Sequence, residues 1–163
     1  EMIDGYLAFA AGEGDEAPQE LAVDDLLNRL VTQAHKSHKF DITLSPVKDD
    51  IPAFPMRRNA IQRAFSNIIS NAIRYSTKTI VAIRMRNDEV IITFDDNGAG
   101  IPQERRADAI RPFIRLEESR NRRTGGAGLG LSITSDVILS HGGELTLGES
   151  PLGGLRVAIK LPV

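Results

Sequence analysis

The stretch Asp95-Asp96-Asn97-Gly98-Ala99-Gly100-Ile101 follows a run of β-forming residues, Glu89 to Phe94. A strand that ends in an acid and opens into two spaced glycines suits a ligand lying against the backbone, because each glycine lacks a Cβ and permits a positive φ. The carboxylate of Asp96 can accept a hydrogen bond from a donor such as an exocyclic amine. Turns rich in Asp and Gly often have no role beyond the turn itself. The stretch therefore indicates a ligand site only if partners occur elsewhere in the chain.

Composition limits the class of protein. The chain has 163 residues, of which 41% are hydrophobic, and this is enough for the core of one compact domain. Its formal net charge of -2 gives no general attraction to nucleic acid or to acidic membranes. It contains no cysteine, which excludes disulfides and thiolate chemistry. No apolar run approaches the roughly 18 residues of a membrane span, and no signal peptide is visible. A cytoplasmic location fits these features.

Hydrophobic spacing predicts the elements that precede the Asp-Gly stretch. Asp24 or Asp25 is placed to cap a helix, whose apolar face holds Leu26, Leu27, Leu30, Val31 and Ala34. Alternation predicts a strand over residues 39–44, and a short strand is expected near residues 53–54. The strongest helix follows Pro55, and its wide apolar stripe consists of Ile61, Ala64, Phe65, Ile68, Ile69, Ala72 and Ile73. Residues 79–85 and 89–94 are expected to form a hairpin around Asn87-Asp88.

The pattern after this stretch completes the predicted fold. Pro102 can open a short helix, and the charged, aperiodic residues 115–126 predict a loop. A helix over residues 129–139 should end before Gly142-Gly143. Two strands, 144–147 and 155–161, follow with a turn-rich segment between them. Because the strands come in hairpins and the helices in separate blocks, we predict an α+β fold, a two-layer sandwich of a mixed sheet with helices on one face.

The first eighteen residues have a different character. Ile3, Tyr6, Leu7 and Ala10 recur at helical spacing over residues 1–11 and predict the end of a helix. Residues 12–18 are polar, acidic and interrupted by Gly and Pro, which is typical of a linker. We therefore assign residues 1–18 to a helix end and linker, and residues 19–163 to the main domain. We expect the sequence to be a piece of a longer protein.

One partner of the Asp-Gly stretch lies on the strongest helix. Asn67 and Asn71 are four residues apart and share a face outside the centre of the apolar stripe. Asparagine is a mediocre helix former, so two at this spacing need a reason. An amide oxygen is a hard ligand, and nucleotide-bound Mg²⁺ takes one or two such protein oxygens. Arg74 could contact a phosphate and Tyr75 could stack nearby. The alternative is that all four residues are ordinary surface residues.

The other partner is the glycine-rich segment Gly125-Gly126-Ala127-Gly128-Leu129-Gly130-Leu131, which opens a predicted helix. Its glycines let the backbone approach a ligand, and the N–H groups at a helix start favour anions. It is neither a Walker A loop, because no Gly-Lys-Ser/Thr follows, nor a Rossmann fingerprint, because no strand leads into it. Several arginines lie just upstream. They form either a solvated basic loop or a lid over a triphosphate.

The chain resembles the sensor histidine kinases through four blocks in the same order. Their N, G1, F and G2 boxes are matched by Asn67-x-x-x-Asn71-Ala72, Asp96-x-Gly98-x-Gly100, Pro112-Phe113-Ile114-Arg115 and Gly126-x-Gly128-Leu129-Gly130-Leu131. This resemblance covers about residues 20–163. Residues 1–12 resemble, over a short length, the end of the second dimerisation helix in kinases of the EnvZ type.

The resemblance implies a Bergerat-type ATP-binding sandwich and a role for each matched residue. Asp96 is expected to bind the adenine amino group, with Gly98, Gly100 and Ile101 beside the base. Asn71 is the expected Mg²⁺ ligand, Asn67 should lie near the metal and phosphates, and both are the expected catalytic residues. The remaining residues expected around the nucleotide, in the lid or in the phosphate loop are Arg74, Tyr75, Phe113, Arg115, Arg120, Gly126, Gly128, Leu129, Gly130 and Leu131.

One feature of the family is missing. Its phosphoacceptor His lies in a His-Glu/Asp-x-x-x-Pro context, and none of His35, His38 and His141 has that context. We expect all three to be structural or surface residues, with His141 partly charged at a helix end. The resemblance then implies that the chain binds Mg-ATP without phosphorylating itself. The γ-phosphate would go to a His on a dimerisation domain and then to an Asp of a response regulator. The fragment should be monomeric, and the intact protein a homodimer anchored in the bacterial inner membrane.

Three other functions share the fold. ATPases of the gyrase, MutL and chaperone type use a Glu at the position equivalent to Asn67 to activate water, and an amide cannot act as that base. A degenerate nucleotide sensor would retain Asp96 but lose Asn71 or the glycines, whereas this chain retains them all. A serine-directed anti-sigma kinase is closer, but the resemblance of residues 1–12 disfavours it.

Overall fold

The computed structural model describes residues 16–111 and 130–163. The helix predicted over residues 1–11, most of the linker and the loop predicted over residues 115–126 lie outside these ranges. Among the described residues, no helix has both the length and the apolar character needed to cross a membrane.

A five-stranded mixed sheet forms one layer. Its strands, in spatial order, are β2 (Asp41–Leu44), β4 (Lys78–Arg86), β5 (Glu89–Asp96), β7 (Leu155–Pro162) and β6 (Glu144–Glu149). The pair β2 and β4 is parallel, and every other neighbouring pair is antiparallel. A separate antiparallel pair joins β1 (Gln19–Leu21) to β3 (Phe54–Met56).

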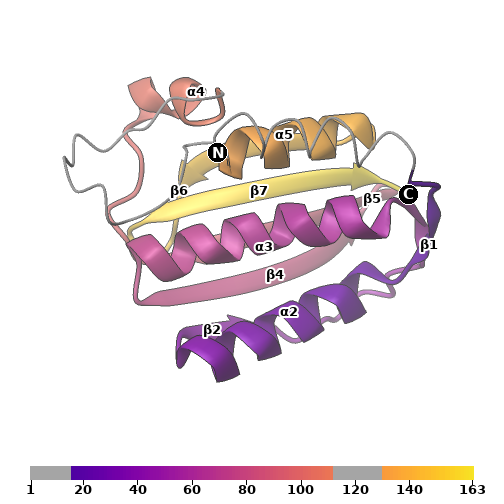
Figure 1. Cartoon of the computed structure of the whole chain (residues 1–163), viewed down its shortest axis with the longest axis horizontal. Coiled ribbons are helices and arrows are strands. Elements are labelled where there is room, and N and C mark those ends of the chain that lie inside the picture. The colour runs from indigo at the N-terminus through magenta and orange to yellow at the C-terminus, as the bar shows by residue number, and fades with distance from the viewer. Residues whose placement is uncertain (1–15, 112–129) are drawn as a thin grey trace.

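Helices form the other layer. The long ones are α2 (Val23–His38), α3 (Arg58–Tyr75) and α5 (Gly130–Ser140), and Figure 1 shows α3 running along the sheet between the other two. A 3-10 turn, η1 (Gln103–Arg105), leads into the short α4 (Arg106–Ala109), as expected after Pro102. The predicted α+β architecture, a mixed sheet with helices on one face, is confirmed.

The core lies between the helices and the sheet, with α3 at its centre. Phe65 of α3 is fully buried, and its ring centroid lies 6.0 Å from that of Phe94 on β5. The predicted stripe of α3 is buried except for Ile73, which is half-buried. This packing fixes α3 relative to the strand that ends in Asp96.

The β4–β5 hairpin decides which acid faces the helices. It closes through Asn87 and Asp88, whose φ values of 49° and 59° suit a type I′ turn. Because side chains alternate along a strand, Asp95 and Asp96 project to opposite faces of the sheet. The predicted strands and turn are confirmed here.

Two local expectations need correction, and one strand was not predicted. Neither Asp24 nor Asp25 caps α2, because the N-cap is Ala22 and both acids lie in the first turn, where they still complement the helix dipole. The strand predicted from residue 39 begins at residue 41, since Lys39 has a φ of 50° and ends α2. The strand β1 was not predicted, because three residues give too little alternation to detect.

Candidate functional site

Asp96 stands at the end of β5 and is held by the backbone around it. Its Oδ1 accepts hydrogen bonds from the N–H groups of Gly98 and Leu155, both at 2.9 Å. No hydrogen bond from the described part of the chain reaches Oδ2. The carboxylate is therefore fixed in orientation while one oxygen stays available to a ligand.

Asp95 has a different role. On the opposite face of the sheet it accepts two hydrogen bonds from the Arg156 guanidinium, at 2.6 and 2.8 Å. These hydrogen bonds to Asp95 raise the pKa of the Arg156 guanidinium above its ordinary value. Of the two adjacent acids, only Asp96 is therefore free to contact a ligand on the helix side.

Two glycines, Gly98 and Gly154, lie against Asp96, and neither position has space for a side chain. A Cβ on Gly98 would lie 2.5 Å from the Tyr75 carbonyl oxygen, and one on Gly154 would lie 2.2 Å from Asp96 Oδ1. Gly154 N also donates to the Asp96 carbonyl at 3.1 Å. The sequence indicated a turn at residues 148–154 but gave no sign that it closes on Asp96. Gly154 is thus a site residue that sequence reasoning missed.

Asn97 ties the site to the end of α3. Its Oδ1 accepts hydrogen bonds from the backbone N–H groups of Thr77 and Lys78, at 3.0 and 2.9 Å, and its Nδ2 donates to Thr77 Oγ1 at 2.9 Å. Its own N–H donates to the Lys78 carbonyl at 3.1 Å. Asn97 therefore holds the segment between α3 and β4 against the first glycine loop.

The two asparagines of α3 face the start of α5. Asn67 Nδ2 lies 3.5 Å from the Gly130 carbonyl oxygen, and a Cβ on Gly130 would lie 3.7 Å from Asn71 Nδ2. Both side chains are half-buried. The structure thus places the asparagine pair of α3 beside Gly130, which is the described end of the glycine-rich segment.

The end of α3 joins this pair to the Asp96 loop. Tyr75 is the last residue of α3 and its carbonyl lies against Gly98. Figure 1 shows the end of α3 and the segment after β5 at the same edge of the molecule. The Arg74 guanidinium lies 6.0 Å from the centre of the Tyr75 ring, and Tyr75 is 45% exposed. Both side chains therefore lie at the surface beside the site.

The remaining predicted residues divide into two groups. Gly100 has a φ of 69°, while Ile101 and Leu131 are half-buried at the two glycine segments. Six predicted site residues lie outside the described ranges: Phe113, Arg115, Arg120, Gly126, Gly128 and Leu129.

The side-chain oxygens of the asparagine pair suit a metal ion that enters the site already bound to a nucleotide. No group of three His, Cys, Asp or Glu residues able to hold a metal occurs in the described ranges. The amide of Asn71 makes no hydrogen bond to any described residue, so its oxygen is available. Mg²⁺ bound to a nucleotide usually takes one or two protein oxygens and completes its shell with phosphates and water. Asn71 and Asn67 fit that requirement.

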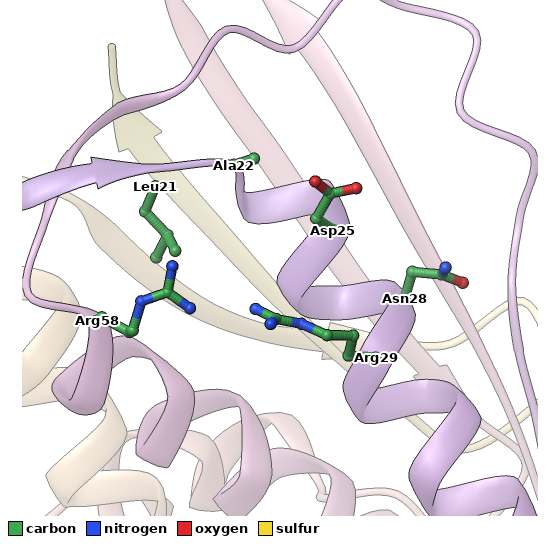
Figure 2. A pocket seen from close by; sticks show the side chains of 6 residues that line it. All are labelled: Leu21, Ala22, Asp25, Asn28, Arg29 and Arg58. Carbon is green, nitrogen blue, oxygen red and sulfur yellow. The ribbon is translucent and has the colours of Figure 1, made fainter.

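A cavity elsewhere does not belong to this site. It has a volume of about 300 Å³ and is lined by Leu21, Ala22, Asp25, Asn28, Arg29 and Arg58. Figure 2 shows Arg29 and Arg58 directed into the space between α2 and the start of α3. None of the predicted site residues lines it.

His35 and His141 make hydrogen bonds within the fold and His38 is exposed, but the expectation for the charge of His141 needs correction. His35 Nδ1 lies 3.0 Å from the Phe40 carbonyl oxygen, next to the end of α2. The expected partial charge on His141 is disfavoured, because burial lowers the pKa of its imidazole; the hydrogen bond to the Val137 carbonyl acts in the opposite direction, and the neighbouring Arg57 lowers the pKa further. Its Nε2 instead accepts a hydrogen bond from the backbone N–H of Arg57 at 3.1 Å.

Sequence comparison finds relatives over the region that forms this site. Residues 56–163 match the family described as histidine kinase-, DNA gyrase B-, and HSP90-like ATPase. The sensor histidine kinase CpxA of Escherichia coli K12 is 46% identical over 106 residues, which cover 64% of this chain and 23% of CpxA. The alginate biosynthesis sensor protein KinB of Pseudomonas aeruginosa is 31% identical over 172 aligned residues, covering 99% of this chain and 28% of KinB. The chain thus spans about a quarter of the length of these relatives.

Solved structures give the same result. The ATP binding domain of PrrB from Mycobacterium tuberculosis has a TM-score of 0.71 and 27% identity, and the match covers 91% of this chain and 98% of that domain. Full-length ShkA in complex with AMPPNP has a TM-score of 0.79, with 99% of this chain and 35% of that chain covered. At 20% identity the second likeness shows the fold alone.

Proposed function

This chain belongs to the histidine kinase-, DNA gyrase B-, and HSP90-like ATPase family, and on that premise we propose that it is the ATP-binding catalytic domain of a sensor histidine kinase. The observation that supports the proposal is that α3 links two parts of the site: its last carbonyl, at Tyr75, lies against Gly98 beside Asp96, and its paired asparagines face Gly130. The similarity to CpxA covers 64% of the chain.

The geometry around Asp96 supports recognition of a base. Because Oδ1 is occupied by two backbone N–H groups, Oδ2 is held in a fixed direction and can accept a hydrogen bond from an exocyclic amine. Gly98, Gly100 and Gly154 keep side chains away from this edge, so a flat ring can approach the backbone. Adenine has both features, an amine and a flat ring.

The paired asparagines support a phosphate and metal position beside the base. Asn71 would hold Mg²⁺ through its amide oxygen, with Asn67 next to it and Gly130 opposite. Mg²⁺ supplies positive charge that offsets the charge of the phosphates. The chain itself contributes orientation, through a helix whose packing is fixed, and a backbone at Gly130 that a ligand can approach.

The chemistry at Asn67 favours transfer over hydrolysis. Hydrolysis in this family requires a base that takes a proton from water, and an amide cannot do this. Phosphoryl transfer depends more on positioning than on covalent help from the protein. We therefore propose that the γ-phosphate passes to an imidazole nitrogen of a dimerisation domain in the same protein, and then to an Asp of a response regulator. None of the three histidines here has the acceptor context, so the chain alone should not phosphorylate itself.

The parent protein follows from the same proposal. The relatives are sensor kinases about four times as long as the matched region. We propose that residues 1–18 are the end of a dimerisation helix and a linker, that residues 19–163 are the catalytic domain, and that the intact protein is a homodimer anchored in the bacterial inner membrane with this domain in the cytoplasm.

Nucleotide binding is tested first by isothermal titration of the 163-residue chain with AMPPNP, with and without Mg²⁺. We expect saturable one-to-one binding that strengthens with Mg²⁺. Asp96→Asn should lose most of the affinity, while Gly148→Ala, at a glycine with no heavy atom within 4 Å, is the matched control. Equal affinity in the wild-type chain and Asp96→Asn would falsify the site assignment.

Transfer is tested in a second experiment. The chain, [γ-³²P]ATP and a separately produced CpxA dimerisation domain are mixed, and acid-labile, base-stable phosphohistidine is measured. We expect label on the dimerisation domain and little release of free phosphate. Rapid phosphate release without labelled histidine would favour the ATPase alternative. Nucleotide binding with neither product would favour the nucleotide-sensing alternative.

A further inference from the structure

Polar contacts join α3 to α5 at three places, and the order of these contacts along α5 is the reverse of their order along α3. Asn67 Nδ2 faces the Gly130 carbonyl at 3.5 Å, and the Arg57 N–H donates to His141 Nε2 at 3.1 Å. Between them, Thr134 Oγ1 lies 3.3 Å from the Ala64 carbonyl oxygen of α3, and its shorter contact, at 2.8 Å, is to the Gly130 carbonyl oxygen of its own helix. The helices are therefore antiparallel, and a shift of α5 along α3 would move Gly130 relative to Asn67. The contact at His141 is the one farthest from the asparagines.

The imidazole of His141 has one arrangement of protons that fits its surroundings. Nδ1 lies 2.7 Å from the Val137 carbonyl oxygen, so it must carry the proton and donate. Nε2 must then be the acceptor for the Arg57 N–H. A second proton would turn Nε2 into a donor facing another donor, so protonation breaks the contact between the two helices.

Charged groups on both sides act on this contact. Arg57, at the start of α3, reaches the Ser140 hydroxyl with its guanidinium and disfavours a charge on His141. Glu16, which precedes β1, accepts hydrogen bonds from the N–H groups of Asn59 and Ala60 at 2.8 and 3.2 Å and favours that charge. Burial has the largest effect and lowers the pKa of the imidazole.

The far end of α5 is already fixed to the sheet. A Cβ on Gly143 would lie 2.3 Å from the Lys160 carbonyl oxygen, so this segment lies directly against β7. Gly142 has a φ of 75° and ends the helix there. With the end of α5 held there, the hydrogen bond from the Arg57 N–H to His141 Nε2 links the start of α3 to the same point.

We propose that His141 is a positioning residue for the nucleotide site: by binding the start of α3 to the end of α5, it sets Gly130 opposite Asn67, and its protonation releases that setting. The part about nucleotide affinity rests on the proposed function, whereas the coupling between His141 and the asparagines does not. The site would then bind nucleotide more weakly as the pH falls through the titration of His141.

The coupling is tested without nucleotide by NMR of the ¹⁵N-labelled chain from pH 8 to pH 5. We expect the side-chain amide signals of Asn67 and Asn71 to shift with the same midpoint as the His141 ring signals. The amide oxygen of glutamine can accept the Arg57 N–H but does not titrate. In His141→Gln, the Asn67 and Asn71 signals should therefore show no such midpoint. In His38→Gln, an exposed control at the end of α2, it should remain. If the Asn67 and Asn71 signals of the wild-type chain do not shift at the pH midpoint of the His141 signals, the proposal is overturned, whether or not the chain binds ATP.

The consequence for the site is measured as AMPPNP affinity at pH 7.5 and pH 5.5. The nucleotide titrates in this range too, so each variant is compared with the wild-type chain under the same conditions. We expect the wild-type chain to lose about fivefold more affinity than His141→Gln on acidification, at the low end of coupling between linked sites. His141→Ala should bind more weakly than His141→Gln at pH 7.5, since it lacks the acceptor. Identical pH profiles for the wild-type chain and His141→Gln would refute the effect on the site.

Discussion

Replacing Gly154 by alanine should disturb the Asp96 site. Gly154 lies in the turn between β6 and β7, which the sequence alone did not link to this site. The new Cβ would lie 2.2 Å from Asp96 Oδ1, 2.5 Å from Gly98 N and 2.6 Å from the Asp96 carbonyl oxygen. Gly154 is not among the glycines with positive φ, so alanine meets no backbone penalty and the effect is steric. Two of the three atoms are backbone, so the strain cannot be relieved by moving a flexible side chain alone.

The size of the effect follows from the bonds at risk. The carboxylate must move, and its Oδ1 holds the N–H groups of Gly98 and Leu155. A hydrogen bond to a charged group contributes about 1.5–3 kcal/mol, and an extra methyl group in a packed position costs about 1–3 kcal/mol. Because the loop can relax in part, we expect a loss of about 2–4 kcal/mol in the free energy of unfolding. Affinity for AMPPNP should fall at least about tenfold, which corresponds to about 1.4 kcal/mol.

Urea denaturation and isothermal titration measure the two effects separately. Gly148→Ala is the matched control, because its Cβ would have no heavy atom within 4 Å and its φ is not positive. It should bind AMPPNP as the wild-type chain does, with stability unchanged or raised by about 0.4–1 kcal/mol. A Gly154→Ala variant with wild-type stability and wild-type affinity would refute the argument that this loop fixes the Asp96 carboxylate.

Three further changes test other parts of the structure. Asp96→Asn should keep most of its stability in urea, since an amide oxygen can still accept the bonds at Oδ1, yet lose about 10–100-fold in AMPPNP affinity; an unfolded variant would contradict this. Asn97→Ala should lower the free energy of unfolding by about 1–2 kcal/mol, because it removes the bonds to the segment after α3, and unchanged urea denaturation would count against that role. Since folding lowers the pKa of His141 below its usual 6.5, the unfolded chain binds this proton more readily. The His141 contribution should be complete above about pH 6.5 and decrease as the pH falls through the folded pKa, so a wild-type chain and His141→Gln with the same pH dependence of unfolding would disprove it.

Some features of the site depended on local sequence alone. The period of α3 placed Asn67 and Asn71 on one face, and the run into Asp96 placed an acid at a strand end. The turn at Asn87 and Asp88 fixed the hairpin, because two residues with positive φ match the twist of the strands. Side-chain spacing along an element follows from backbone geometry, so it is readable without a fold.

Other predictions failed because the sequence cannot decide between near-equivalent local choices. Asp24 and Asp25 are good capping residues, but Ala22 occupies the N-cap, and the helix begins at Val23, which is fully buried. His141 lies at a helix end that would favour its charge, yet burial has the larger effect and lowers the pKa of its imidazole. Burial depends on what packs over a residue, which local spacing does not specify.

By itself, the sequence determined the α+β class, the order of the helices and strands that follow β1, and the motifs that carry the nucleotide-binding hypothesis. Only the tertiary structure decided that Leu155 and Gly154 close on Asp96, that Glu16 caps α3, and that His141 binds the start of the same helix. Arg57 and His141 are 84 positions apart in the chain. Hydrophobic periodicity is local and records which face of an element is buried, whereas contacts between distant backbone segments arise when the layers pack together.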